Sequence, residues 1–165
     1  MLGIDPGTAT MGYGVVSGSA GKPVRLVECG VVRTRAGEQL SDRLAVIFDG
    51  VTELLQRHHP DAVAVEGLFH GRNARSALIL GHARGVVLLA AARGGLTPAE
   101  ISPAEVKRAV TGTGAASKAQ VAAMVTRLLK LASAPSPADA ADGVAIALTH
   151  FMRLGVRARA PRGTR

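Results

Sequence analysis

The sequence predicts an α/β domain built on a five-stranded mixed sheet with helices on both faces. Two β-rich runs near the N-terminus are separated only by a short turn-forming segment, which is typical of antiparallel strands. Beyond them, segments with a helical period alternate with short apolar runs, as in parallel crossover connections. The length of 165 residues suits a single domain of this kind.

The first three strands are predicted in the N-terminal part of the chain. The run Leu2–Asp5 is short and apolar, and it ends in an acid followed by a Pro-Gly turn. The β-rich runs 11–18 and 22–35 follow, and we expect them to form an antiparallel meander with the first strand. Because the first run is so short, we expect the natural chain to start a few residues upstream.

Two helices and one strand are predicted in the middle of the chain. Apolar residues recur at helical spacing over 40–58. The run 61–66 is a short buried strand with Glu66 at its C-terminal edge. A helix over 73–93, capped by Asn73, is apolar or small on opposite sides, so one side can cover the sheet while the other needs a further partner.

The C-terminal part adds a strand near 96–101 and three helices. Ser102 opens the first of these with an S-P-x-E pattern, and Ser117 opens the second as part of a capping box. Ser136 is the expected N-cap of the last helix, which places Asp139 at its third position. The sequence after residue 154 has no periodicity.

This pattern divides the chain into a domain over 1–154 and an Arg-rich, disordered tail over 155–165. The net charge is +8, and removing the four arginines of the tail leaves +4. A basic balance favours a polyanionic partner such as nucleic acid, although a biased amino-acid composition explains it equally well.

The single cysteine, Cys29, excludes an intrachain disulfide and fits a reducing cytoplasm. No run of about 18 uninterrupted apolar residues predicts a membrane span.

Four acids stand where secondary structure can fix their positions. Asp5 and Glu66 end two strands that would lie side by side if they pair in parallel. Asp139 and Asp142 are three residues apart and share one face of the last helix. Converging carboxylates repel each other unless cations separate them, so such a group is suited to hard divalent ions. Paired ions can activate water and stabilise a leaving oxygen in phosphodiester hydrolysis.

Each acid also has an ordinary interpretation. Asp139 and Asp142 could complement the dipole of their helix, Asp5 could serve its turn, and Glu66 could be a surface charge. Taken singly, the residues leave both interpretations open.

The chain resembles the RuvC family over nearly its whole length, to about Phe151. The resemblance is carried by four segments in the family's order and spacing: GIDPGTATMGYGVV, VEGLFHGRNARSALILGHARGV, VKRAVTGTGAASKAQV and PADAADGVAIALTH. It implies a ribonuclease H-like fold, a homodimer, and Mg²⁺- or Mn²⁺-dependent cutting of two opposed strands of a Holliday junction, with two ions per active site. It also implies a branch-migration helicase complex as a partner.

By motif position, the resemblance places the family's catalytic and metal-binding acids on Asp5, Glu66, Asp139 and Asp142. Some relatives carry a histidine where this chain has Asp139. The resemblance further implies DNA contacts by residues of the second and third segments, namely Phe69, Arg72, Asn73, Lys107 and Lys118. Stacking of Phe69 on an unpaired base competes with inward packing of its ring, and the two lysines could equally be solvated surface charges.

Two other functions are compatible with parts of the sequence. A non-catalytic junction-binding protein would keep the fold and the basic surface, although it would have little reason to retain four repelling acids. GIDPGT also resembles the first phosphate loop of the actin and sugar-kinase superfamily. That superfamily needs two such domains and an adenosine-binding motif, and this sequence carries only one domain and no such motif.

Overall fold

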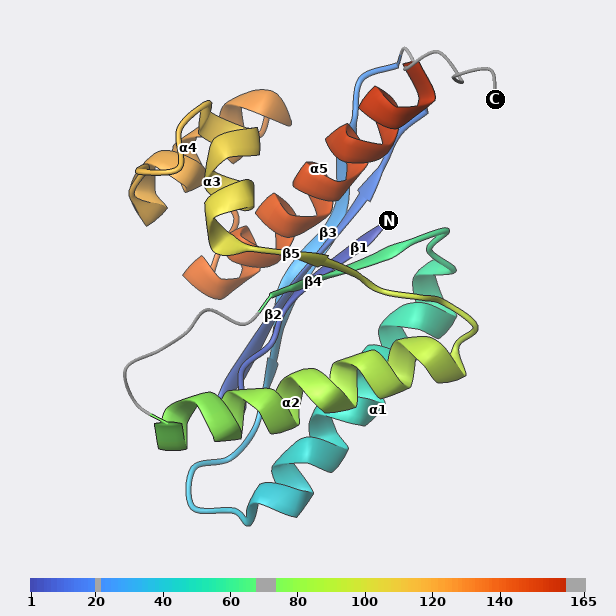
Figure 1. Ribbon diagram of the computed structural model, residues 1–165, viewed down its shortest axis with the longest axis vertical. Coiled ribbons are helices and arrows are strands. Elements are labelled where there is room, and N and C mark those ends of the chain that lie inside the picture. The colour runs from blue at the N-terminus through green and yellow to red at the C-terminus, as the bar shows by residue number, and fades with distance from the viewer. Residues whose placement is uncertain (20–21, 68–73, 160–165) are drawn as a thin grey trace, which may run out of the picture.

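The computed structural model of the chain describes residues 1–19, 22–67 and 74–159, with side chains up to residue 155. Five strands and five helices alternate over these ranges (Figure 1). Their bounds are β1 Leu2–Asp5, β2 Thr10–Ser17, β3 Arg25–Arg33, α1 Leu40–His58, β4 Val63–Glu66, α2 Ala74–Arg93, β5 Ala99–Ile101, α3 Pro103–Thr111, α4 Lys118–Leu128 and α5 Ala138–Arg159.

The sheet has the mixed topology that the sequence predicts. Its strand order is β3-β2-β1-β4-β5. The first three strands form an antiparallel meander, while β4 pairs in parallel with β1 on one side and with β5 on the other. β1 is therefore central, and its apolar residues Leu2 and Ile4 have no exposed surface.

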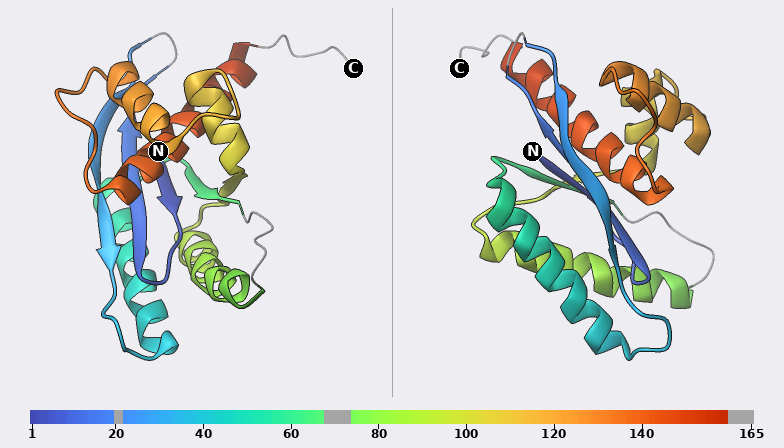
Figure 2. Two further views of the ribbon diagram at one scale, coloured as in Figure 1. Left: turned by 90° about the vertical axis from the view of Figure 1, so that its left-hand side faces the viewer. Right: turned by 180° about the vertical axis from the view of Figure 1, so that it is seen from behind.

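Helices cover both faces of this sheet, as predicted (Figure 2). α1 and α2 lie on one face, where Ile47, Val51 and Val87 pack against the strands in one hydrophobic core. α5 crosses the other face, and α3 and α4 pack on its outer side around a second core that contains Ile101, Val121 and residues of α5. The sheet is therefore packed against a hydrophobic core on each of its faces.

Glycines allow α5 to lie unusually close to the strands beneath it. A Cβ atom on Gly12 would collide with the carbonyl oxygen of Asp139, and one on Gly143 would lie 2.5 Å from the backbone of Tyr13. A Cβ on Gly14 would likewise lie 2.5 Å from the Cα of Val144. Since glycine within a strand commonly marks such a close approach, the first turn of α5 is held directly against β2.

The capping boxes predicted at Ser102 and Ser117 are confirmed, because each hydroxyl accepts the backbone N–H three residues later. The start of the last helix was placed one residue too early. α5 begins at Ala138, after a tight turn in which the N–H of Ala140 donates to the carbonyl oxygen of Pro137, so Ser136 is not its N-cap. Asp139 is thus the second residue of the helix.

The predicted tail also needs correction, because α5 continues to Arg159. Residues 155–159 are helical, since Arg and Ala residues favour the continuation of a helix even where no apolar period marks it. The expected cap Asn73 and the last part of the predicted tail, 160–165, lie outside the described residues.

α2 leaves much of its apolar surface uncovered in the monomer. Leu78 is 67% exposed and Leu89 is 55% exposed, and no atom of the described residues lies within 4 Å of a Cβ placed on Gly81 or Gly85. By length and composition alone this helix could cross a membrane, which for one helix is weak evidence, and 22% of its most apolar window is buried in this fold. Its other side packs against α1 through the first core.

Candidate active site

The carboxyl ends of β1 and β4 bring two acids to one edge of the sheet. Ile4 pairs with Val65, so the residues that follow them, Asp5 and Glu66, are neighbours on adjacent parallel strands. The parallel pairing on which the sequence prediction of their proximity depended is therefore confirmed. A strand end positions a side chain well, because the ladder of hydrogen bonds fixes the backbone up to that residue.

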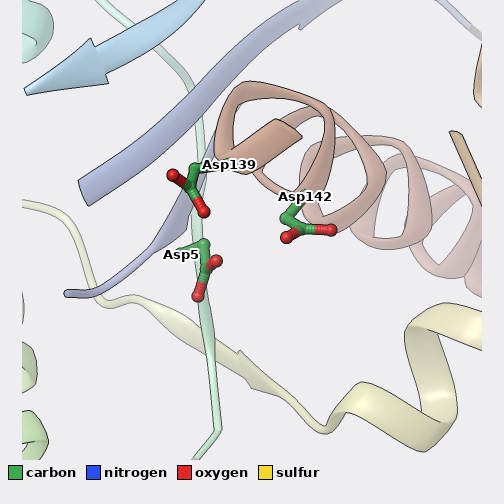
Figure 3. Close-up of side chains that lie close together, drawn as sticks. All are labelled: Asp5, Asp139 and Asp142. Carbon is green, nitrogen blue, oxygen red and sulfur yellow. The ribbon is translucent and has the colours of Figure 1, made fainter. Parts of the chain in front are cut away.

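The first turn of α5 brings two further acids to the same place. Asp139 and Asp142 point from α5 toward Asp5 at the end of β1 (Figure 3). One carboxylate oxygen from each of these three residues lies within 4.8 Å of the others. Glu66 is not part of this trio, but its carboxyl group is hydrogen-bonded to that of Asp5, and it lines the same cavity. Asp5 is thus the residue that touches both parts of the cluster.

The cluster is electrostatically costly, and Asp5 carries most of the cost. Burial, the negative charge of Glu66, a hydrogen bond with Glu66 and the charge of Asp142 together raise the pKa of the Asp5 carboxyl to about 8, with burial as the largest cause. The charge of Lys118 acts in the opposite direction. At neutral pH and without a cation, Asp5 therefore holds a proton.

Lys118 supplies the positive charge that faces the cluster. Its Nζ donates to Oδ2 of Asp142 at 2.7 Å, and this hydrogen bond raises the pKa of the lysine. The lysine side chain is 78% exposed, whereas that of Asp142 is only 23% exposed. Exposed pairs of this kind are weak, so Lys118 can leave Asp142 at little cost.

A cavity of about 260 Å³ opens beside the acids. Its wall combines the carboxylates with both predicted lysines and a set of apolar side chains. The lining residues are Asp5, Glu66, Pro103, Val106, Lys107, Lys118, Val121, Asp142 and Ile146. The apolar side chains exclude water from part of the cavity lining, which strengthens the electrostatic interactions of the charged side chains beside them.

The donor set fits a hard divalent cation. Such ions take oxygen ligands, and carboxylates are the strongest of these in proteins. Three carboxylate oxygens already converge, and the raised pKa of Asp5 reflects its burial and the neighbouring negative charge, which a cation would neutralise. Bound to such a cluster, a divalent cation promotes phosphodiester hydrolysis.

The structure brings together six of the nine residues named from the sequence. All four acids and both lysines, Lys107 and Lys118, lie around one cavity or cluster. Phe69, Arg72 and Asn73 lie outside the described residues.

The apolar side chains that line the cavity, and the glycines that let α5 pack closely on β2, were not predicted from the sequence. Gly12 and Gly14 within a strand, and Gly143 directly after Asp142, were the available signals for a close backbone approach. The apolar side chains gave no signal, because Val106, Val121 and Ile146 look like ordinary core residues of three separate helices.

Comparison with known proteins agrees with this geometry. The family model described as "Crossover junction endodeoxyribonuclease RuvC" matches residues 1–150. A protein of that name from Parafrankia sp. is 52% identical over 153 residues, which are 93% of this chain and 86% of the relative.

Solved structures give the same result. The structure described as "T. thermophilus RuvC in complex with Holliday junction substrate" superposes with a TM-score of 0.89 at 40% identity, covering 94% of each chain. This likeness confirms the ribonuclease H-like fold. A yeast mitochondrial Holliday junction resolvase, Ydc2, matches with a TM-score of 0.69 at 16% identity, which shows a shared fold alone.

Replacing Asp5 by asparagine tests the electrostatics of the cluster. The raised pKa means that the native state binds more protons than the unfolded state between about pH 4 and pH 8, so the wild-type stability falls as pH rises through that window. In EDTA at pH 8, Asp5→Asn should therefore be more stable than the wild type, by up to about 5 kcal/mol, since the shift spans about four pKa units of about 1.4 kcal/mol each. At pH 4 the two proteins should unfold alike.

Urea unfolding at both pH values measures this difference. Adding Mg²⁺ at pH 8 should stabilise the wild type and leave Asp5→Asn nearly unchanged. Equal stabilities of the two proteins at pH 8 in EDTA would show that burial and the neighbouring acids do not destabilise the ionised form of Asp5.

Proposed function

Because the chain belongs to the RuvC family of crossover junction endodeoxyribonucleases, we propose that it resolves four-way DNA junctions as a homodimer by paired, symmetric strand cuts. The observation that carries this proposal is the convergence of Asp5, Asp139 and Asp142 within 4.8 Å of one another, with Glu66 bonded to Asp5. The reaction is a phosphodiester hydrolysis that serves DNA recombination and repair.

In this proposal all four acids are metal ligands, with Asp5 shared between two positions. Asp5 converges with Asp139 and Asp142 and is also hydrogen-bonded to Glu66, an arrangement that suits two cations sharing Asp5. Mg²⁺ is the expected ion, and Mn²⁺ would have the same oxygen preference. When bound, the two ions would activate the attacking water and stabilise the leaving oxygen. Asp5 must lose its proton for this, so metal binding is expected to release one.

Lys118 and Lys107 are proposed to hold the DNA backbone at the cavity. The pair between Lys118 and Asp142 compensates part of the negative charge of the cluster while DNA and metal are absent. Once cations neutralise the acids, the lysine becomes available to a phosphate group. Lys107, which also lines the cavity, would contact a neighbouring phosphate.

The resemblance also assigns DNA contacts to Phe69, Arg72 and Asn73, which belong to the connection between β4 and α2. Because Glu66 ends β4, residues that follow it are within reach of the nucleotides beside the scissile phosphate. We propose that Phe69 stacks on an unpaired base there, while Arg72 and Asn73 contact the backbone or base edges.

A dimer is proposed because one chain carries one carboxylate cluster while resolution needs two cuts. A two-fold axis would place two clusters on opposed strands of the junction. The uncovered side of α2, with exposed Leu78 and Leu89 and the open surface at Gly81 and Gly85, fits such an axis. We further propose that the enzyme acts in the cytoplasm, together with a branch-migration helicase complex.

The function is tested by Asp142→Asn in a cleavage assay on a mobile four-way junction with Mg²⁺. The variant should lose at least about 100-fold in cleavage rate, because one ligand is gone while the charge of the cluster changes. Junction binding should stay equal or become tighter, since one repelling charge is removed. Asp49→Asn, on the exposed side of α1, is the matched control and should cut normally. Cleavage by Asp142→Asn at the wild-type rate would exclude Asp142 as a ligand.

The dimer is tested by Gly85→Glu. Gly85 is exposed on α2 and a side chain there meets nothing within the described part of the chain, so the monomer should fold as before. Analytical ultracentrifugation at micromolar concentration should find a dimer for the wild type and a monomer for the variant, because charges would face each other across the axis. Ala45→Glu on α1 should stay dimeric. A monomeric wild type would contradict the proposed interface.

A further inference from the structure

A second polar feature lies at the end of the sheet where β1 ends. The turn between β1 and β2 and the loop from β3 into α1 lie side by side there (Figure 2). Arg43, in the first turn of α1, joins them: its Nε donates to the carbonyl oxygen of Thr8 at 3.1 Å and to Oγ1 of Thr34 at 3.0 Å. Thr34 Oγ1 itself donates to the same carbonyl at 2.6 Å, and its N–H donates to Ala9 at 3.2 Å.

These contacts use only one of the three guanidinium nitrogens. Among the described residues, Nη1 and Nη2 of Arg43 have no hydrogen-bond or ion-pair partner, and neither nitrogen is buried. The guanidinium is thus fixed in orientation by its inner edge while its outer edge, which carries most of its donors, faces solvent. This differs from a freely moving surface arginine, because the entropy of ordering the side chain has already been lost in the folded protein.

The turn held by Arg43 offers further donors. The backbone N–H groups of Gly7, Thr8 and Ala9 have no acceptor within the described part of the chain. Two more exposed cations, Arg33 and Arg35, belong to the strand end and loop that Thr34 joins. Unpaired backbone N–H groups beside a fixed guanidinium form the donor set that binds phosphate oxygens in proteins.

We propose that Arg43 and the turn Gly7–Ala9 bind a backbone phosphate of the junction, at a position other than the scissile one. The inference rests on the proposed function, because the phosphate belongs to the same DNA that the acids cut. Thr8 follows Asp5 by three residues, so the turn lies at most about 10 Å from the acid along the chain. Phosphates of one strand recur at about 3.4 Å of helix rise, which places the bound phosphate within a few nucleotides of the cut.

Such a contact would fix the register of the DNA strand over the acids. The lysines of the cavity lie on α3 and α4, on the α5 side of the sheet, whereas Arg43 lies on α1. A strand held on both sides of the cluster cannot slide along it, so the scissile phosphate would be set by two fixed points. Arg43 is therefore a DNA-binding residue in this proposal, and its contacts to Thr8 and Thr34 position it.

A purely structural role for Arg43 is the competing explanation. Junction DNA in which single phosphates are made neutral distinguishes that role from a phosphate contact. Junctions are prepared with a single uncharged methylphosphonate at each of the first few positions on either side of the cut, and their affinities are measured in Ca²⁺ to prevent cleavage. The proteins are the wild type, Arg43→Gln, and Arg25→Gln as control. Arg25 is an exposed arginine at the opposite end of β3, so the control removes the same charge away from the turn.

We expect Arg43→Gln to bind the unmodified junction about tenfold more weakly, as is typical for one charge-assisted hydrogen bond. The slope of log affinity against log salt should fall by about 0.9, the value for one phosphate contact. One methylphosphonate position should weaken the wild type and Arg25→Gln by a similar factor but have little further effect on Arg43→Gln. That non-additivity identifies the phosphate that Arg43 contacts.

The inference is overturned if every methylphosphonate weakens the wild type and Arg43→Gln by equal factors, with an unchanged salt slope. In that case any loss of thermal stability in Arg43→Gln assigns the residue to holding the turn alone. Arg43→Lys keeps the charge and guards against misfolding of the glutamine variant: it should recover the salt slope but only part of the affinity, because an ammonium cannot bond the turn and the phosphate together. If the wild type itself fails to bind or cut junctions, the proposed function fails first.

Discussion

Mutual repulsion among four carboxylates is the constraint on which the rest of this structure depends. Asp5 converges with Asp139 and Asp142 and is hydrogen-bonded to Glu66, and burial together with the charges of Glu66 and Asp142 raises its pKa to about 8. A flexible chain would relax by moving the acids apart. Here two parallel strands and one helix hold the acids in place. The free energy of folding therefore offsets the repulsion among them, and a bound cation would relieve that repulsion.

The rigidity comes from backbone contacts more than from the acids' own neighbours. Gly12 and Gly143 let the first turn of α5 rest on β2, and a methyl group at either position would separate Asp139 from Asp5. The same fold leaves one side of α2 uncovered, as expected if a second copy completes the protein. The cost of holding the cluster and the uncovered side of α2 are thus both consequences of one sheet with helices on both faces.

Much of the fold and of the carboxylate cluster could be predicted from the sequence, because those features follow from local patterns. Residues close together in the sequence are enough to identify the strand ends, the helical period of α1 and the capping boxes at Ser102 and Ser117. The end of α5 was not predicted, because an Arg- and Ala-rich segment extends the helix with no apolar period. The Lys118–Asp142 pair joins residues 24 apart in the chain and the contact of Arg43 with Thr8 joins residues 35 apart, so only the three-dimensional structure can show them.

The central claim is that the acids are held together in order to bind cations. Diffraction from crystals soaked in Mn²⁺, collected at the manganese absorption edge, tests it most directly. Two anomalous peaks are expected at the cluster, one bounded by Asp5, Asp139 and Asp142 and the other between Asp5 and Glu66, with Lys118 displaced from Asp142. A cluster without any peak, with the Lys118–Asp142 pair intact at saturating Mn²⁺, would contradict it.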